Sequence, residues 1–223
     1  MAPWGMRAAS LDFRAMTDGS KRRGCLFVIA APSGAGKTSL VKAVVERDPS
    51  LRVSVSHTTR KQRETEVPGR DYHFIGIDEF RRLRDAAEFL EHAQVFDNYY
   101  GTGRAQVEAL RNAGHDVILE IDWQGAQQVR KAQPDCVSIF ILPPSRAELE
   151  KRLRNRRTDS DEVIARRLRD SIADMTHYAE FDRVIVNQDF ETAVAQLLEI
   201  LRGKPGYEAD RPELEPLLAE LLA

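Results

Sequence analysis

Seven consecutive apolar residues at positions 25–31 lead directly into a glycine-rich segment, and a helical pattern follows from Gly36 to Arg47. A continuous apolar run that ends at a glycine-rich turn predicts a strand buried on both faces, as in a parallel sheet. Pro49 marks the end of the helical pattern, because the residue before a proline is disfavoured in a helix. A buried strand, a tight loop and a helix in this order predict an α/β fold with a parallel sheet.

The loop between the strand and the helix approaches the phosphate-binding pattern G-x-x-x-x-G-K-[ST], with alanine at the first position instead of glycine. Small residues allow successive backbone N–H groups to curve around a phosphate, and the helix N-terminus adds partial positive charge. Lys37 can reach the β- and γ-phosphates, and the Thr38 hydroxyl can bind Mg²⁺. The alternative is a glycine-rich turn that binds nothing. The residues expected to bind ATP are Ala31, Pro32, Ser33, Gly34, Ala35, Gly36, Lys37 and Thr38.

The rest of the chain continues the alternation of apolar strands and helices. Buried strands are expected at residues 116–121, 137–142 and 183–186, and helices at 104–112, 124–131, 145–155, 161–177 and 190–201. Helices that connect parallel strands cover both faces of the sheet. The predicted fold class is therefore α/β, with a parallel central sheet flanked by helices.

The stretch 53–103 departs from this alternation. Its expected strands are short and close together, at residues 53–57, 71–75 and 89–96. A short helix is expected to begin between them with Asp78 as its N-cap. Short alternating strands of this kind favour a small, more antiparallel insertion.

Both ends of the chain differ in character from the middle. Residues 1–23 carry charges throughout and are predicted to be a disordered leader. Translation from Met16 and an RNA-binding role for this basic arm are open alternatives. The variable tail 204–223 contains three prolines and is expected to end in a short amphipathic helix at 217–222.

Composition limits the class of protein. A chain of 223 residues that is 42% hydrophobic and 30% charged is expected to form one large globular domain. Its formal net charge of −2 supplies no bulk attraction for nucleic acid. No apolar run approaches the roughly 18 residues of a spanning helix, and the leader lacks the apolar core of a signal peptide. We therefore expect a cytoplasmic protein without nucleic-acid or membrane partners.

A nucleotide-binding loop of this type serves GTPases, ATPases and small-molecule kinases. GTPases read their base with an Asn-Lys-x-Asp segment after a later strand, and the sequence contains none. The remaining classes are kinases and ATPases, so the stretch 53–103 decides between them.

Seven further segments resemble the guanylate kinases, in particular the bacterial ones: residues 54–60, 69–74, 89–93, 98–102, 119–125, 139–144 and 185–187. The resemblance spans about 24–203. It implies a P-loop NTPase core (about 24–52, 104–144 and 178–203), a GMP-binding region (53–103) and an arginine-rich helical lid (145–177). It also implies the reaction ATP + GMP ⇌ ADP + GDP, with Mg²⁺ as cofactor, GMP and ATP as the small-molecule partners, and a role in purine nucleotide metabolism.

The resemblance implies roles for acceptor-site residues, which are stated as expectations. The acceptor phosphate is held by Arg60, Arg63, Tyr72 and Tyr100, and guanidinium forks suit phosphate oxygens. Glu91 accepts hydrogen bonds from guanine N1–H and N2–H₂, whereas adenine presents an acceptor at N1. Ser56, Thr102 and Asp122 complete the expected contacts to the base.

The resemblance also implies roles at the donor side and in the lid. Arg152, Arg156 and Arg167 stabilise the transferring phosphoryl group, together with Lys37. Thr38 and Glu120, the latter through water, hold Mg²⁺, and Asn187 contacts the adenine side. Two departures from the family pattern are Glu120, where many relatives have aspartate, and Arg157, where many have glycine. The alternative for Glu120 is that the acids at this position cap the next helix. The alternative for the lid arginines is that they pair with acids on helices exposed to solvent.

Two other functions remain possible from the sequence. A P-loop kinase that acts on a ribose bisphosphate would not need Glu91, Ser56 and Thr102, since a sugar phosphate has no purine edge. A non-catalytic guanylate-kinase-like binding module usually has a degraded P-loop, whereas Lys37 and Thr38 are intact.

Overall fold

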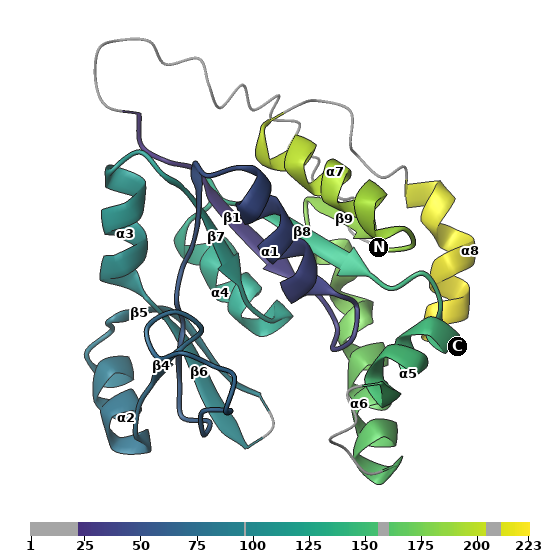
Figure 1. The fold of residues 1–223 in the computed structure, drawn as a ribbon, viewed down its shortest axis with the longest axis horizontal. Helices are drawn as coiled ribbons and strands as arrows, with labels where there is room; N and C mark the ends of the chain where they lie inside the picture. Colours follow the sequence, from purple (N-terminus) through teal and green to yellow (C-terminus); the bar gives the residue numbers. More distant parts are fainter. Residues whose placement is uncertain (1–21, 96, 156–160, 204–210) are drawn as a thin grey trace.

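The computed structural model describes residues 22–95, 97–155, 161–203 and 211–223. Five parallel strands form the central sheet in the order β2-β7-β1-β8-β9 (Figure 1). Their bounds are Leu51–Val53, Asp116–Glu120, Leu26–Ala30, Val137–Leu142 and Arg183–Val186, in that order. The first predicted strand lies at the centre, with Leu26 opposite Val117 and Phe27 opposite Val137.

Helices cover both faces of this sheet, as expected for parallel strands. The alternate residues Phe27 and Ile29 pack with α1 (Lys37–Arg47) and α7 (Phe190–Leu201) in one core cluster. Their neighbours Leu26 and Val28 face a second cluster, formed with α3 (Arg104–Asn112) and α4 (Trp123–Ala132). Both faces of β1 are therefore buried, which explains why its sequence is apolar at every position. The predicted α/β class is confirmed.

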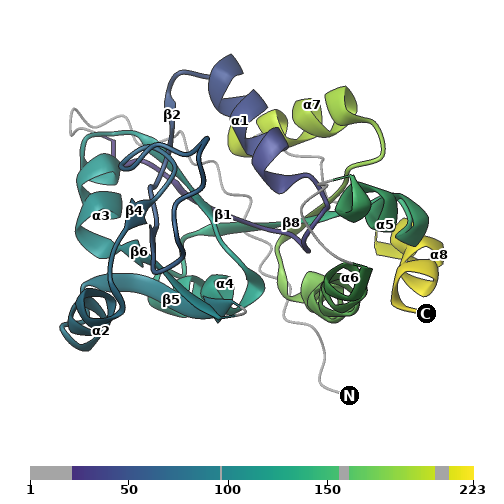
Figure 2. The same cartoon turned by 60° about the horizontal axis from the view of Figure 1, so that its bottom comes forward.

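The predicted insertion is a separate mixed sheet with the strand order β4-β3-β6-β5. The strands are β3 (His57–Thr58), β4 (His73–Phe74), β5 (Phe89–Val95) and β6 (Asn98–Gly103), and α2 (Ile77–Asp85) packs beside them. The pairs β3–β6 and β5–β6 are antiparallel, whereas β3–β4 is parallel. Figures 1 and 2 show this sheet and the helices α5 and α6 on opposite sides of the molecule.

The predicted strand at 53–57 is wrong, because the chain leaves one sheet and enters the other within it. Residues 51–53 pair with β7 of the central sheet, and His57 pairs with Gly101 of the insertion. Between them, the buried Ser54 donates its N–H to Ile118 O and its hydroxyl to Gln106 Oε1. Alternation of polar and apolar residues fits both short strands, so it hides the break.

Two further differences lie in the insertion. Strand β6 was not expected, because Gly101 and Gly103 are poor strand formers; a Cβ on Gly101 would lie 3.1 Å from the Phe89 ring. Helix α2 begins at Ile77 with Gly76 as its N-cap, so Asp78 is inside the first turn and is not the cap.

The predicted lid contains α5 (Arg146–Arg154) and α6 (Asp161–Met175), and a 3₁₀ turn, η1 (Thr176–Glu180), follows where the helix was expected to reach 177. The tail helix α8 (Arg211–Leu222) is longer than expected and packs on α6. Its buried residues Leu214, Leu218 and Leu221 join the core cluster that contains Ile164 of α6.

The leader was expected to reach residue 23, but Arg22 and Arg23 contact the domain. Arg22 is hydrogen-bonded to Asp116, and Arg23 Nη2 lies 2.5 Å from Glu108 Oε2. Residues 1–21 lie outside the described part of the chain. No helix in the described ranges is both long enough and apolar enough to cross a membrane.

Candidate active site

The loop at residues 31–38, which is expected to bind phosphate, needs glycine at two positions. Gly34 and Gly36 have φ values of 92° and 96°, in the left-handed region that side chains disfavour. A Cβ on Gly36 would lie 2.4 Å from Asn187 Nδ2, and one on Gly34 would lie 2.9 Å from Leu149 Cδ1. Both glycines are thus required by conformation and by packing, while Ala31 sits where the fold tolerates a side chain and is half-buried.

Two backbone carbonyls of this loop accept hydrogen bonds from side chains outside the loop. Asn187 Nδ2 donates to Ala35 O at 2.7 Å, and Ser171 Oγ of α6 donates to Ser33 O at 3.1 Å. In a trans peptide the C=O and the next N–H point in opposite directions. The two bonds therefore help to aim the N–H groups of Gly34 and Gly36 away from these donors. Asn187 is buried and engaged with the loop, so its expected adenine contact remains a prediction.

Lys37 and Thr38 begin α1 and face the end of β7. Lys37 Nζ donates to Ile121 O at 2.7 Å, and the Thr38 hydroxyl is hydrogen-bonded to the Glu120 carboxylate. A hydroxyl and a carboxylate are hard oxygen donors of the kind that Mg²⁺ prefers. The described residues contain no group of three or more His, Cys, Asp or Glu side chains able to hold a metal ion. This oxygen pair therefore suits an Mg²⁺ ion that takes its remaining ligands from phosphates and water.

Glu91 is an acid buried in the insertion. Its side chain belongs to β5, is 3% exposed, and accepts a hydrogen bond of 2.5 Å from the Thr102 hydroxyl of β6. Burial raises the pKa of Glu91 to about 7, and the Thr102 hydrogen bond acts in the opposite direction. Ser56 Oγ lies 3.4 Å from Thr102 Oγ1. Three of the four residues expected at the base, Ser56, Glu91 and Thr102, are therefore neighbours.

Gly125 of α4 lies directly against this acid, because a Cβ there would be 2.5 Å from Glu91 Oε2. Asp122 is the N-cap of α4, and its carboxylate accepts from Gly125 N at 2.7 Å. The helix-capping alternative raised for Glu120 therefore applies to Asp122 instead, whereas Glu120, the last residue of β7, contacts Thr38. Asp122 remains close enough to Glu91 that its charge helps to raise the pKa of Glu91.

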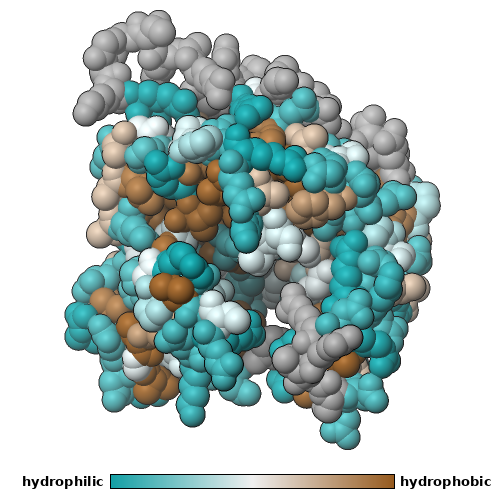
Figure 3. Space-filling model, in the orientation of Figure 1, coloured by the Kyte–Doolittle hydropathy of each residue, from teal (hydrophilic) through white to brown (hydrophobic). Residues whose placement is uncertain are grey.

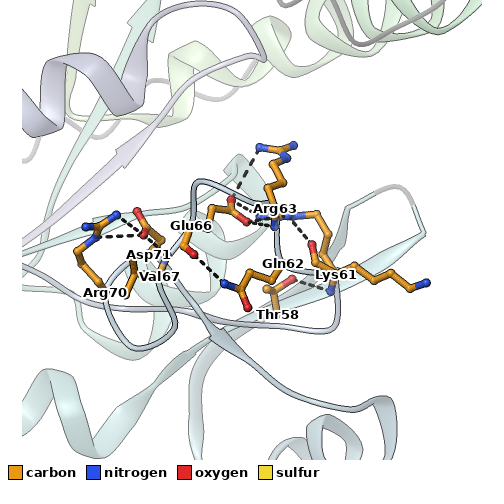
Figure 4. Close-up of polar contacts among 9 residues, drawn as sticks. Thr58, Lys61, Gln62, Arg63, Glu66, Val67, Arg70 and Asp71 are labelled. Atoms are coloured by element: carbon orange, nitrogen blue, oxygen red, sulfur yellow. Dashed lines mark hydrogen bonds and ion pairs between the residues drawn. The ribbon is translucent and has the colours of Figure 1, made fainter.

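The two arginines expected at the acceptor phosphate share one partner that sequence reasoning missed. Glu66 takes two hydrogen bonds from the Arg60 guanidinium, at 2.7 and 3.1 Å, and one from the backbone N–H of Arg63 at 2.8 Å. Figure 4 shows Glu66 at the centre of this loop. The carboxylate fixes Arg60 and also lies 3.9 Å from Arg63 Nη1, although the Arg63 side chain is 67% exposed. Only its position as an acid in a basic loop marks Glu66 in the sequence.

The two tyrosines lie beside Arg60. The guanidinium carbon lies 5.4 Å from the Tyr72 ring centre and 5.8 Å from that of Phe74, and the Tyr72 and Tyr100 rings are 6.0 Å apart. Burial raises the pKa of Tyr72 to about 12, so its hydroxyl keeps its proton at neutral pH. The structure therefore brings Arg60, Tyr72 and Tyr100 together as donors.

The lid arginines divide into two kinds. Arg152 reaches the donor loop, with Nη1 at 3.4 Å from Ala35 O, while its Nε donates to Glu148 at 3.0 Å. Arg154 instead pairs with Glu150 and Asp161 on the surface, as the alternative of paired lid arginines expected. Arg167 lies on α6, and Arg156 and Arg157 lie outside the described residues. In Figure 3 the surface is hollowed between the insertion and the lid.

The loop at residues 31–38 and the mixed sheet that carries Glu91 thus lie at the same edge of the central sheet, where β1 and β7 end (Figure 1). This arrangement is that of a P-loop phosphotransferase, in which two phosphate-bearing substrates meet between the core and an insertion. A family model described as guanylate kinase matches residues 23–204. The chain belongs to the guanylate kinase family.

Individual relatives agree with this assignment. A guanylate kinase of Methylococcus capsulatus is 55% identical over 201 residues, which are 90% of this chain and 98% of that protein. The guanylate kinase of Escherichia coli K12 is 49% identical over 204 residues, with 90% and 99% covered. The crystal structure of guanylate kinase from Anaplasma phagocytophilum superimposes with a TM-score of 0.69 at 35% identity and covers 87% of this chain and 95% of its own.

Proposed function

We propose that this chain transfers the γ-phosphoryl group of ATP to GMP and so produces ADP and GDP. The observation that carries the proposal is the buried Glu91, hydrogen-bonded to Thr102, in a chain whose loop at residues 31–38 keeps Lys37 and Thr38. A ribose bisphosphate kinase would have no use for this buried acid. A binding module would have no use for Lys37 at the start of α1. The proposal includes a cytoplasmic location and no nucleic-acid or membrane partner.

The donor half of the site binds and orients the triphosphate of ATP. Backbone N–H groups of residues 33–38 and the N-terminus of α1 bind its phosphates. Lys37 exchanges its contact with Ile121 O for the β- and γ-phosphates. Thr38 and Glu120, through water, would hold Mg²⁺, which when bound neutralises charge on the phosphate oxygens.

The acceptor half binds GMP at both ends. Arg60, Arg63, Tyr72 and Tyr100 donate to its phosphate, with Arg60 held in place by Glu66. Glu91 as the carboxylate accepts from guanine N1–H and N2–H₂, and Ser56, Thr102 and Asp122 surround the same edge. A phosphate oxygen of GMP then attacks the γ-phosphorus, while the bond from that phosphorus to the bridging oxygen of ADP breaks.

The lid completes the environment of the transferring group. Arg152 already contacts the donor loop, and we assign Arg156 and Arg167 to the same task of charge stabilisation. These guanidinium groups stabilise the negative charge on the equatorial oxygens of the transferring phosphoryl group. Closure of the lid would also exclude water, which otherwise competes with GMP as acceptor.

The test of the function is ADP release from ATP and Mg²⁺ with a panel of acceptors: GMP, dGMP, AMP, UMP, CMP, ribose 1,5-bisphosphate and none. Turnover with GMP, alone or with dGMP, is expected. Turnover with the sugar phosphate only would keep the donor site and overturn the acceptor site. Protein that binds GMP but shows no turnover with any acceptor would favour the binding module.

Arg60→Lys is expected to raise the KM for GMP by about 10–100-fold and to leave the KM for ATP unchanged. A lysine cannot keep both the bidentate bond to Glu66 and a planar edge for the phosphate. Initial rates at varied GMP and ATP measure both constants. Arg70→Lys is the matched control, because Arg70 is exposed and bonds only its neighbour Asp71 in Figure 4. Equal effects of the two substitutions would contradict the role of Arg60.

The KM for GMP is expected to fall as the pH rises from about 6 to 8. Burial raises the pKa of Glu91 to about 7, so the neutral acid predominates below that pH and cannot accept both guanine hydrogen bonds. Raising the pH creates the carboxylate and strengthens binding. The phosphate of GMP also ionises, near pH 6, so Glu91→Gln is measured in parallel to subtract that contribution. An identical pH profile in this variant would exclude Glu91 as the cause.

A further inference from the structure

Helix α6 contacts the loop at residues 31–38 and helix α4 through two residues one turn apart. Ser171 Oγ donates to Ser33 O of the donor loop at 3.1 Å. Asp174 Oδ1 accepts from Trp123 Nε1, at the start of α4, at 3.0 Å. Residues three apart lie on the same face of a helix. A single rigid segment therefore touches the donor loop and the helix that borders the acceptor base.

Ser171 is an unusual residue for this position. It is 1% exposed in the middle of a helix, where serine is a weaker helix former than alanine. A serine hydroxyl within a helix commonly bonds the carbonyl one turn earlier in the same helix. Here it reaches a different segment, and the Ser33 carbonyl that it contacts belongs to the same peptide as the N–H of Gly34. Ser171 thus helps to fix the direction of one N–H of the phosphate-binding loop.

Asp174 is tied to the acceptor side through Trp123. The indole stacks on His177 with 3.5 Å between ring centroids and 9° between planes, so its orientation is restricted. Trp123 is the first residue of α4, directly after the cap Asp122. Gly125, two residues further, lies against Glu91, as the 2.5 Å approach of its Cβ position shows. A shift of α6 relative to α4 would therefore change the packing around Glu91.

We propose that Ser171 and Asp174 are positioning residues through which α6 couples the donor and acceptor halves, so that ATP and GMP strengthen each other's binding. The inference rests on the proposed function. Donor phosphates order the loop at Ser33 and hence α6, while guanine orders Glu91 and the start of α4. A ligand that orders one end of α6 lowers the ordering cost of the ligand at the other. By linkage, each substrate must raise the affinity of the other by the same factor.

The test is calorimetry of GMP binding with and without a saturating non-hydrolysable ATP analogue and Mg²⁺. The wild-type protein is expected to bind GMP about 5–150-fold more tightly with the analogue. Ser171→Ala and Trp123→Phe remove one hydrogen bond each and should reduce this factor to below about twofold. GMP binding without the analogue should change by less than about threefold. Asp174→Asn keeps an oxygen that can accept from the indole and should retain the coupling.

Gln127→Ala supplies the matched control. Gln127 Nε2 donates to Glu180 at 2.7 Å and also joins α4 to the segment after α6, but it is exposed and contacts neither half of the site. This variant should keep the full coupling factor, and thermal unfolding checks that every variant is folded. The proposal would be overturned, while GMP turnover stands, if the wild type showed no coupling. It would also be overturned if Ser171→Ala and Trp123→Phe kept the coupling factor of the wild type. Absence of both GMP binding and turnover in the wild type would overturn the proposed function, and this inference with it.

Discussion

Replacing Lys37 with alanine is expected to lower kcat by about 10²–10³-fold, the range observed when one preorganised electrostatic donor is removed from an active site. Lys37 is the first residue of α1, and its ammonium is held at the end of β7 by Ile121 O. At that position the ammonium can stabilise the negative charge that develops on the phosphates during transfer. The KM for GMP is expected to change little, because the acceptor half lies in the insertion.

Lys42→Ala is the control for this experiment. Lys42 is on the same helix, but it is exposed and its ammonium lies 3.9 Å from Glu46, so it takes no part in the site. Initial rates with saturating ATP, Mg²⁺ and GMP measure kcat for both variants. If Lys37→Ala retained wild-type turnover, the donor-loop assignment would be wrong, whatever the result with Lys42.

Replacing Glu91 with glutamine is expected to lower kcat/KM for GMP by about 10³-fold. Two charge-assisted hydrogen bonds of about 1.5–3 kcal/mol each would be lost or reversed, because the amide NH₂ is itself a donor. The side chain is 3% exposed and glutamine has nearly the same shape, so the fold should be preserved. The preference for GMP over AMP should fall with it, since a buried polar site rejects an analogue that leaves its groups unpaired.

Glu88→Gln provides the comparison, because Glu88 lies close in the sequence but is about half exposed and pairs with Arg82. Its kinetics with GMP and AMP should match the wild type. Unchanged GMP kinetics in Glu91→Gln would mean that another group reads the base. A lowered kcat/KM for both nucleotides in equal proportion would indicate a structural defect.

The buried strands of the core could be predicted because burial on both faces leaves a continuous apolar sequence. Leu26–Ala30 and Val137–Leu142 show this directly, as all but one of their residues are apolar and every one is buried. The helices that cover them could be predicted from their periodicity. The break between β2 and β3 could not, because two short strands of the same period look like one. Strand β6 was missed since glycines are used there for close packing, as at Gly101 against Phe89.

Site residues could be predicted where they are adjacent in the sequence and together form a motif, as in the loop at residues 31–38. Glu66, Ser171 and Trp123 carry no such signal, because their contacts are made to distant parts of the chain or within a loop without regular structure. Asn187 was assigned to the adenine side, yet its side chain contacts the donor loop through Ala35 O. Such contacts depend on how the elements pack, which local sequence does not specify. The roles of the individual site residues remain predictions for the substitutions above to test.

The central position of β1 has a consequence for how the chain assembles. Its partners are distant, since Leu26 pairs with Val117 and Phe27 with Val137. The insertion, by contrast, is contained within residues 57–103. On a ribosome, the whole mixed sheet is synthesised before the first partner of β1, which begins at Asp116. We therefore expect the mixed sheet at residues 57–103 to gain protection from hydrogen exchange early, and the loop at residues 31–38, which follows β1, to be among the last parts to form.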